Sequence, residues 1–347
     1  MIRVGVIGAS GYAGGELARY LLMHPGVEIT YLASSSLDGR PLTHAYPSFL
    51  GQDLPICEKF DMDAAADRAD VFFQAQGNGM GMQVAPGLIG YGKKLIDVPA
   101  DFRIKDRAVY SRYYGAEHTA RDLLAEAVYG ISELHPEQIA AARVVANPGC
   151  YATGAILALA PLVSLKMAAP GSIIVDSKSG VSGAGRSKLQ VSGLFTEVNE
   201  GFKAYGVATH RHTPEIEQEL SVLAGEEIRL NFTPHLAPMN RGILTTAYAN
   251  VASEITTAGL IESYREFYGG KRFVVVLDEG EQPNTKNVFG TNFCHIGVVV
   301  DGRTNRAIVT SAIDNMGKGA AGQAVQNLNL ICGFDETTGL MGSAVYP

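Results

Sequence analysis

The chain has 347 residues, 46% of them hydrophobic, and its 35 acidic and 28 basic side chains give a formal charge of −7. This length corresponds to two domains of about 150 residues each, and the acidic balance argues against a nucleic-acid binder. No stretch approaches the roughly 20 uninterrupted apolar residues of a membrane span. The N-terminus enters a strand-like run without an export signal, so we expect a cytoplasmic protein without membrane or nucleic-acid partners.

Short apolar runs alternate with helical patterns in the first part of the chain. This alternation is typical of βαβ units and predicts a mainly parallel sheet, as in a Rossmann-type α/β domain. We expect helices at 14–23 and 151–163. The expected strands are 3–7, 28–33, 71–74, 94–97 and 144–146.

After Pro170 strand patterns dominate, with few helices between them. This predominance of strand patterns predicts an α+β domain with a large, mainly antiparallel sheet. We expect one helix at 214–223 and a last one at 318–330, whose small residues favour close packing and which we expect to return to the first domain. The expected strands are 172–176, 229–235, 243–251, 273–277 and 293–301.

A glycine-rich turn follows the first expected strand. Residues 8–14 read Gly-Ala-Ser-Gly-Tyr-Ala-Gly, a variant of the dinucleotide fingerprint that opens onto a helix. Glycines let the backbone approach a pyrophosphate, which amides and the dipole at the helix N-terminus stabilise. A merely structural turn is the alternative, but the position between strand and helix favours a nucleotide. The candidate cofactor residues are Gly8, Ser10, Gly11, Tyr12 and Gly14.

The end of the second strand favours NADP over NAD. An NAD enzyme carries an acid about 20 residues past the last glycine, on the ribose 2′-hydroxyl. Here the chain has Ser34, Ser35 and Ser36, followed by Asp38 and Arg40. Hydroxyls and a guanidinium accept a 2′-phosphate, whereas the carboxylate of Asp38 argues against one. A plain polar loop is the alternative; otherwise Ser34, Ser36 and Arg40 bind the phosphate.

Cys150 lies in the sequence Ala-Asn-Pro-Gly-Cys-Tyr-Ala-Thr (146–153), between a strand and an apolar helix. Its place at the helix N-terminus would stabilise a thiolate, and the same amides would hold an oxyanion. We therefore expect a nucleophile. The wide cysteine spacing fits neither a metal knuckle nor a disulfide framework. The cysteines expected to be structural free thiols are Cys57, Cys294 and Cys332.

Two histidines flank an arginine at the entrance of the helix expected at 214–223. His210 and His212 form a polar cluster suited to acid/base or substrate duty. A His-x-His pair can bind metal, but no third ligand is evident nearby, so we expect no metal. The histidines expected to be ordinary core or surface residues are His24, His44, His118, His135, His235 and His295.

Two further segments are suited to anions. Arg103 follows the strand at 94–97, which places it at the rim where ligands of open α/β sheets bind. Residues 177–186 form a loop rich in serine and glycine that contains Lys178 and Arg186, with amides and cations enough for a second anion site. Either segment could instead be a solvated loop.

Together these motifs resemble the N-acetyl-γ-glutamyl-phosphate reductases of arginine biosynthesis, within the aspartate-semialdehyde dehydrogenase superfamily. The resemblance runs over nearly the whole chain. Its most specific segments are 8–14, 100–103, 147–151, 179–186, 210–216 and 318–324.

The resemblance implies that NADPH reduces N-acetyl-glutamyl 5-phosphate to the semialdehyde through a thioester on Cys150. It implies His210 as the acid/base, because His210 is the family's first histidine in this motif, although the residues alone do not separate it from His212. Arg103 would meet the phosphate. The implied NADP contacts are Gly183, Ala184, Gly185, Asn315 and Lys318, and the implied further substrate contacts are Asn147, Ser182, His212 and Glu215.

Two segments depart from the family pattern. Residues 76–79 read Gln-Gly-Asn-Gly where leucine-proline-histidine-glycine is usual, and Pro99 stands where serine is common. A sister reductase, acting on an N-acetylated or carrier-bound aminoadipyl phosphate or on aspartyl phosphate, therefore remains an alternative. A third hypothesis is a non-catalytic NADP sensor with Cys150 as a redox switch, against which Arg103 and the histidines argue.

The resulting domain prediction has two parts. Residues 1–149 and 312–347 form the NADP-binding domain, and residues 150–311 form the catalytic and oligomerisation domain. We expect a homodimer or homotetramer, with the large sheet of the second domain as its interface.

Overall fold

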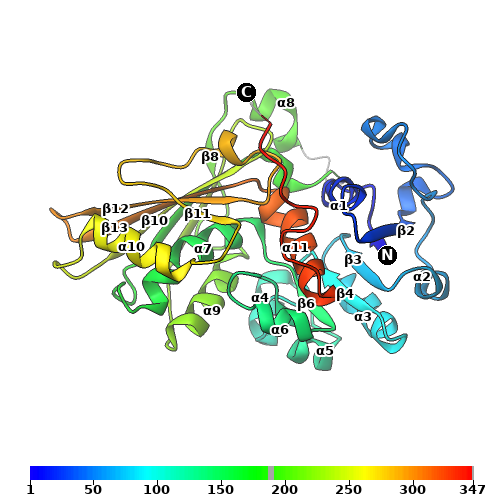
Figure 1. Ribbon diagram of the computed structural model, residues 1–347, viewed down its shortest axis with the longest axis horizontal. Coiled ribbons are helices and arrows are strands. Elements are labelled where there is room, and N and C mark those ends of the chain that lie inside the picture. Colours follow the sequence, from blue (N-terminus) through cyan, green and yellow to red (C-terminus); the bar gives the residue numbers. More distant parts are fainter. Residues whose placement is uncertain (187–190, 346–347) are drawn as a thin grey trace. The chain divides into compact units, whose positions relative to one another are not determined.

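The computed structural model describes residues 1–186 and 191–345, which form two compact units (Figure 1). Unit 1 comprises residues 1–149, Gly185, Arg186 and residues 320–342. Unit 2 comprises the other described residues. The chain passes from unit 1 to unit 2 at 149/150 and from unit 2 to unit 1 at 319/320. The return lies there because a strand ending at Ile313, and the turn after it, belong to the sheet of unit 2.

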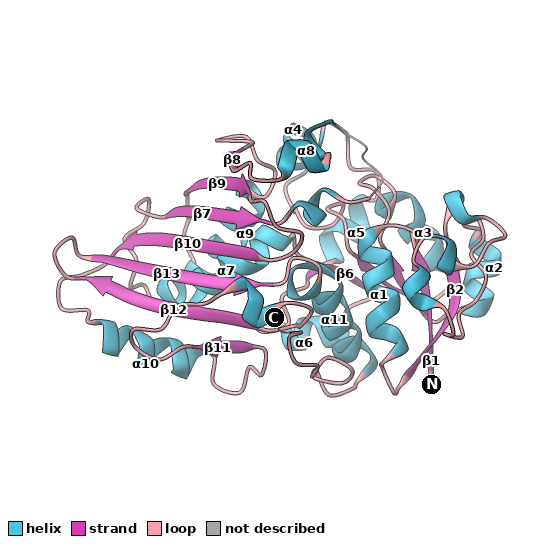
Figure 2. Cartoon of the chain, turned by 90° about the horizontal axis from the view of Figure 1, so that it is seen from above, coloured by secondary structure: helices cyan, strands magenta, loops and turns pink. Residues whose placement is uncertain are grey.

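Unit 1 contains a six-stranded parallel sheet of order β2-β1-β3-β4-β6-β5. The expected Rossmann-type architecture is confirmed. Every residue of the β3 sequence Val-Phe-Phe-Gln is buried, because helices cover both faces of the sheet (Figure 2). β5 is too short to leave a sequence pattern, and it was not predicted. The strands are β1 Ile2–Ile7, β2 Val27–Ala33, β3 Val71–Gln74, β4 Lys94–Asp97, β5 Val128–Tyr129 and β6 Val144–Ala146.

The last helix of unit 1, α11, packs on α1 and α6 although it is rich in amides. Its buried Asn327 donates to the Gly130 carbonyl and to the Asn147 side chain, and Gln323 also donates to the Gly130 carbonyl. Because these polar groups are hydrogen-bonded to one another and to the backbone, their burial carries little free-energy penalty. The helices of unit 1 are α1 Tyr12–Leu22, α2 Met62–Arg68, α3 Gly81–Gly90, α4 Arg107–Tyr114, α5 Arg121–Glu126, α6 Pro136–Ala141 and α11 Gly322–Cys332.

Unit 2 contains a seven-stranded sheet of order β11-β12-β13-β10-β7-β9-β8. It is mixed: β11 with β12 and β7 with β9 pair in parallel, and the other neighbours are antiparallel. β13 was not predicted; it completes a long hairpin with β12. The strands are β7 Ile174–Ser179, β8 Lys203–Ala204, β9 Asn231–Leu236, β10 Ile243–Asn250, β11 Val274–Val276, β12 Cys294–Asp301 and β13 Arg306–Ile313.

Helix α7 is the buried centre of unit 2, with every residue from Tyr151 to Val163 out of solvent. Pro161 cannot donate to the carbonyl of Leu157, and the hydroxyl of Tyr268 takes its place as donor. Tyr268 directly follows α10, a helix that was not predicted although Thr256 caps its first turn. The helices of unit 2 are α7 Cys150–Ser164, α8 Phe195–Val198, α9 Thr213–Ala224 and α10 Thr257–Phe267.

Candidate active site

In unit 1, the turn between β1 and α1 accepts only glycine at two points. Gly8 has a φ of +96°, and a Cβ there would lie 2.8 Å from the backbone carbon of Ala75. A Cβ on Gly14 would lie 2.3 Å from the Gly8 oxygen, so α1 can approach the strand this closely only without a side chain. The N-terminal amides of α1 are thereby brought to the end of β1. This cradle has the shape and the donors that a dinucleotide pyrophosphate requires.

Three hydroxyl groups gather beside the glycine turn. The Ser34 hydroxyl donates to the Ser10 hydroxyl at 2.8 Å, and the Ser36 oxygen lies 3.1 Å from that of Ser10 and 3.2 Å from that of Ser34. Arg186 Nη1 donates to the Ser10 carbonyl at 3.1 Å, with its guanidinium 5.2 Å from the ring centre of Tyr46. This hydroxyl cluster (Ser10, Ser34 and Ser36) with its cation is chemically suited to a phosphate monoester.

Arg186 was not among the predicted cofactor residues. The signal that could have found it is its position at the end of the loop 177–186, which the sequence had already marked as an anion site.

The carboxylate of Asp38, which argued against NADP, is bonded elsewhere. Its Oδ1 accepts from the Lys59 amide at 3.1 Å, and its Oδ2 lies 3.4 Å from Lys59 Nζ. Arg40 is exposed on the same loop, where its backbone pairs with that of Cys57. The negative charge is therefore neutralised locally by Lys59.

Arg103 is only 6% exposed and braces the backbone ahead of Cys150. Its Nε donates to the Asn147 carbonyl at 2.7 Å, and its Nη2 donates to the Val98 carbonyl at 2.6 Å. Asn147 in turn donates to the Ala320 carbonyl at 3.0 Å. The structure thus buries this guanidinium, which was expected on an open rim, and gives it a role in holding the turn before α7.

Two buried carboxyl groups share the N-terminus of α3. Asp101 accepts from the amides of Gly79 and Met82 and from the Tyr110 hydroxyl. A Cβ on Gly81 would lie 2.4 Å from Asp97 Oδ1 and 3.0 Å from Asp101 Oδ2. Burial, and then the neighbouring Asp101, raise the pKa of Asp97 well above its usual range. The burial of Asp97 therefore favours the protonated form of its carboxyl group.

The segment that departs from the family pattern is tied to the same group. Asn78 Oδ1 accepts from the Ala100 amide at 3.3 Å, and the Gly79 amide donates to Asp101. Gly79 has a φ of +92°, which favours glycine. The unusual residues thus make hydrogen bonds of their own to the 97–103 segment.

In unit 2, Cys150 is the first residue of α7 and is half-buried. A Cβ on Gly319 would lie 2.9 Å from the Cys150 Cβ, so the backbone of Gly319 packs directly against Cys150. We call the surroundings of Cys150 its seat, and the Gly319 backbone one wall of that seat. The cysteines expected to be structural are free thiols, with Cys57 and Cys294 buried. Burial raises the pKa of the Cys57 and Cys332 thiols to about 11, which keeps both protonated and unreactive.

The ring of Tyr151 joins the two candidate histidines. Its centre lies 5.6 Å from that of His210 and 5.8 Å from that of His212, with both rings edge-on. The Tyr205 hydroxyl donates to the Tyr151 hydroxyl at 2.9 Å, and the latter donates to the His235 carbonyl. Because Tyr151 follows Cys150 directly, this aromatic cluster lies beside the start of α7.

The two histidines differ in what surrounds them. His210 Nδ1 accepts from the His212 amide at 3.1 Å, so the neutral ring carries its hydrogen on Nε2. Burial, and then the charge of Arg211, lower the pKa of His210 to about 4. His212 is more deeply buried, with its Nε2 4.0 Å from an oxygen of the fully buried Glu215. His210 is thus a neutral donor at neutral pH, and His212 is paired within the protein.

The remaining predicted residues lie in the segment 182–185 and in the segment that follows β13. Asn315, just after β13, bonds to two other segments: its Oδ1 accepts from the Gly242 amide at 2.7 Å, and its Nδ2 donates to Ser182 Oγ at 2.9 Å. Lys318 is fully buried, with Nζ 5.6 Å from the ring centre of Phe273. The segment that was expected to approach the nicotinamide, Gly183, Ala184 and Gly185, is exposed.

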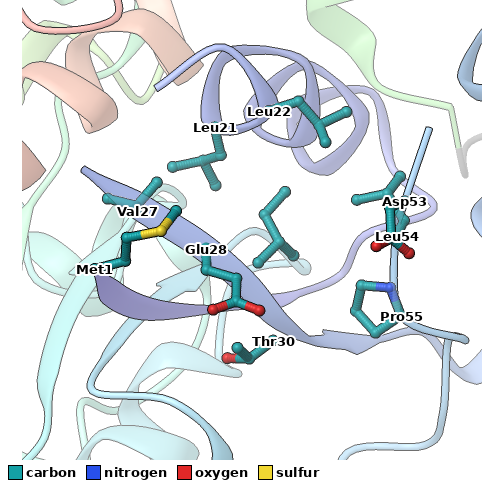
Figure 3. Close-up of a pocket in the computed structure, with 10 residues that line it drawn as sticks. Met1, Leu21, Leu22, Val27, Glu28, Thr30, Asp53, Leu54 and Pro55 are labelled. Atoms are coloured by element: carbon teal, nitrogen blue, oxygen red, sulfur yellow. The ribbon is translucent and has the colours of Figure 1, made fainter. Parts of the chain in front are cut away.

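A cavity of about 450 Å³ in unit 1 lies away from the glycine turn (Figure 3). It is lined by Met1 and Val27, at the starts of β1 and β2, and by Leu21 and Leu22 near the end of α1. Gly8 and Ser34 follow the opposite ends of the same two strands. The cavity is lined by none of the residues predicted to bind the cofactor.

Residues 1–186 and 191–345 contain neither a membrane-spanning helix nor a cluster of metal-ligating side chains. No helix there has both the length and the apolar character needed to cross a membrane. Nor do three His, Cys, Asp or Glu side chains of this described part come together in an arrangement that could hold a metal ion.

Two solved structures share the fold. Aspartate semialdehyde dehydrogenase II from Vibrio cholerae, complexed with ASA, matches with a TM-score of 0.72 over 96% of this chain and 98% of that one, at 16% identity. Aspartate semialdehyde dehydrogenase with NADP from Candida albicans matches with a TM-score of 0.69 over the same shares, also at 16% identity. Identities this low establish the fold alone.

Family models and sequence relatives are more specific. The semialdehyde dehydrogenase NAD binding domain matches residues 3–142, and the dimerisation domain matches residues 150–315. The N-acetyl-gamma-glutamyl-phosphate reductase of Pelotomaculum thermopropionicum is 51% identical over 100% of this chain and 99% of its own length. That of Geobacter sulfurreducens is 51% identical over the full length of both chains. The chain therefore belongs to the N-acetyl-gamma-glutamyl-phosphate reductase family.

Proposed function

We propose that this enzyme reduces N-acetyl-glutamyl 5-phosphate with NADPH to N-acetylglutamate 5-semialdehyde and inorganic phosphate, a step of arginine biosynthesis. The observation that carries the proposal is the seat of Cys150. This half-buried thiol begins a buried helix, between the backbone of Gly319 and a tyrosine–histidine cluster. Full-length identity near 50% to reductases of this name supports the choice of substrate.

The chemistry assigned to Cys150 is acyl transfer. The thiolate attacks the acyl carbon of the acyl phosphate, the carbon–oxygen bond to phosphate breaks, and phosphate leaves, so that a thioester remains on the sulfur. Reduction of the thioester gives a tetrahedral oxyanion, whose collapse breaks the carbon–sulfur bond and returns the thiolate. The amides of the first turn of α7 hold the negative charge of the thiolate and of the oxyanion.

His210 is the side chain that we assign to the oxyanion. Its Nδ1 is occupied by the His212 amide, so Nε2–H is the group that it can present. A neutral donor stabilises the developing charge without first having to lose or gain a proton. The burial of His212 beside Glu215 makes it the support of His210 and the lesser candidate for the oxyanion donor.

The glycine cradle and the hydroxyl cluster of unit 1 fit NADP. When bound, this cofactor supplies the hydride that reduces the thioester. The amides after Gly8 hold the pyrophosphate, and Ser10, Ser34 and Ser36 with Arg186 hold the 2′-phosphate. The other predicted cofactor contacts, Gly183 to Gly185, Asn315 and Lys318, remain part of this proposal.

The substrate contacts are proposed with one refinement. Asn147 and Ser182 keep their predicted roles. Since Arg103 donates to two backbone carbonyls, its contribution is to hold the segment before Cys150 in place, and any contact with substrate phosphate comes in addition.

Assembly through the sheet of unit 2 is the proposed quaternary structure. Helices α7 and α10 contact this sheet (Figure 2). Alternate β10 residues such as Thr245 and Ala247 are buried. Their neighbours Leu244, Thr246 and Tyr248 are only half-buried. A dimerisation domain matches this part of the chain. We therefore propose a homodimer, or a homotetramer built from it, that covers this face, which sedimentation of the purified protein tests.

The decisive experiment runs the reaction in reverse. The protein is given NADP and N-acetylglutamate 5-semialdehyde, with and without inorganic phosphate, and the absorbance of NADPH is followed. We expect phosphate-dependent NADPH formation that disappears in Cys150→Ser. Activity with only the aminoadipyl or aspartyl homologue of the aldehyde would refute the substrate while keeping the mechanism. The absence of NADPH formation with all three aldehydes would refute the proposed enzymatic activity.

A further inference from the structure

Asp314 is a fully buried carboxylate that the proposed reaction does not use. It directly follows β13 in unit 2. Its Oδ1 accepts from Arg241 Nη2 at 2.9 Å and from the amides of Met316 and Gly317 at 2.8 and 3.0 Å. Its Oδ2 accepts from the Gly290 amide at 2.6 Å. This many donors on one buried carboxylate indicate a rigid junction of three segments that are distant in sequence.

The same residue also holds the turn that touches the nucleophile. The backbone carbonyl of Asp314 accepts from the Gly319 amide at 2.9 Å, so the turn from 314 to 319 is closed from within. Gly319 lies against Cys150 so tightly that a Cβ would come within 2.9 Å of the cysteine Cβ and 3.3 Å of its Cα. Any displacement of this turn therefore moves or releases the wall behind Cys150.

Charge explains why the junction needs an aspartate. A buried carboxylate is stable only when it is paired and hydrogen-bonded. Arg241 supplies the opposite charge from a side chain that is 20% exposed, with its guanidinium 5.3 Å from the ring centre of Phe289. An asparagine would keep an acceptor for the Met316 and Gly317 amides. Its NH₂ group would, however, take the place of Oδ2 and face the Gly290 amide, which is itself a donor.

We propose that Asp314 is a positioning residue that fixes the seat of Cys150 through the 314–319 turn. It touches neither substrate nor cofactor; it acts by keeping Gly319 in place, and thereby the direction of the sulfur. The inference deepens the proposed function, because it assumes that Cys150 is the nucleophile of that reaction. Misplacing a reacting group by about 1 Å can cost on the order of 10²-fold in rate.

The test combines steady-state kinetics with alkylation of each cysteine, read by peptide mass spectrometry. In Asp314→Asn we expect kcat to fall about 10- to 100-fold, while the KM for the acyl substrate stays within about threefold of its value in the unaltered protein. Without a firm wall, Cys150 is more accessible, so its reaction with iodoacetamide becomes faster. Cys57 and Cys294, both fully buried, remain as protected as before.

The controls separate this role from general destabilisation. Asp301→Asn removes a similar arrangement, an aspartate that accepts from the amide and guanidinium of Arg303, at the far end of the β12–β13 hairpin, and it should change neither readout. Gly319→Ala adds the clashing methyl with Asp314 intact and should also lower kcat. An Asp314→Asn protein with unaltered kcat and alkylation, or with all four cysteines exposed together, overturns the proposal.

Two outcomes complete the test. Should Asp314→Asn fail to fold, an unaltered kcat in Gly319→Ala overturns the proposal by itself, whereas a reduced kcat supports it. Alkylation requires no substrate, so a protein that is inactive on the acyl phosphate still reports whether Asp314 controls Cys150. The failure of the proposed function and the failure of this inference are thus distinguishable.

Discussion

The cofactor cradle of unit 1 and the cysteine site of unit 2 are built in opposite ways. The cradle consists of backbone that turns within seven residues, Gly8 to Gly14, and only its hydroxyl cluster comes from the next strand. The cysteine site depends on side chains and turns far apart in the chain, with Tyr205, His210 and Gly319 around the start of α7. A backbone site is visible as a local motif, whereas a site assembled from distant parts shows only its reactive residues.

Loss of the nucleophile should have the largest effect. In Cys150→Ser we expect activity to fall on the order of 10⁴-fold or more, because a serine hydroxyl is not ionised at neutral pH and no other group can form the thioester. Cofactor binding, which we assign to the cradle of unit 1, should persist. Enzyme kinetics together with NADPH fluorescence titration measure both. Substantial turnover by the serine variant would show that the reaction bypasses the site in unit 2.

Removal of the oxyanion donor should have the next largest effect. In His210→Ala we expect kcat to fall about 10²- to 10³-fold, and in His210→Asn, which keeps an N–H donor, a smaller loss. Since burial lowers the pKa of His210 to about 4, kcat of the unaltered enzyme should show no inflection from this ring near its ordinary pKa. A pH–rate profile checks this, and an inflection near 6.5 that vanishes in the asparagine variant would contradict the neutral-donor role.

The same buried ring makes stability depend on pH. The pKa of His210 is about 4 in the folded protein, below its ordinary value of 6.5, so the unfolded chain binds the proton more tightly. Stability from a neutral His210 is therefore present above pH 6.5 and is lost as pH falls toward 4, by at most about 1.4 kcal/mol per pH unit. Urea unfolding at several pH values should show a shallower decline in His210→Asn than in the unaltered protein.

The selectivity for NADPH over NADH tests the hydroxyl cluster of unit 1. In Ser34→Asp we expect kcat/KM for NADPH to fall about 10²-fold relative to NADH, because a carboxylate in the hydroxyl cluster repels the 2′-phosphate. Arg186→Ala removes one charge-assisted contact and should lower kcat/KM for NADPH about tenfold. Ser35→Ala, beside the cluster but not part of it, is the matched control. Equal losses with NADPH and NADH would mean that these residues do not contact the 2′-phosphate.

The smallest effect is expected at Asp38. Its partner Lys59 is largely exposed, so the ion pair is worth about 1 kcal/mol or less. In Asp38→Asn the ratio of NADPH to NADH activity should stay within about twofold of the unaltered value, and thermal unfolding should be nearly unchanged. A marked rise in that ratio would reveal that the carboxylate faces the ribose after all.

Much of the architecture followed from local pattern. The parallel strands of unit 1 were visible as short apolar runs, because both faces of that sheet are buried. β5 and β13 were missed for different reasons: β5 has only two residues, and β13 mixes Thr310 and Ser311 into its apolar pattern. The chain returns to unit 1 at residue 320, directly after the 314–319 turn, and no local pattern predicts the hydrogen bond that closes this turn.

The candidate site also has features that local sequence predicts and features that only tertiary structure shows. The sequence alone determined the glycine turn, the cysteine before an apolar helix and the pair of histidines, because each is a local arrangement of backbone, dipole or titrating group. Only the tertiary structure decided that Arg103 is buried against carbonyls, that Arg186 joins the serine cluster, and that Asp314 supports the wall behind Cys150. Burial and hydrogen-bond partners come from chain segments far apart in the sequence, and folding alone brings those segments together.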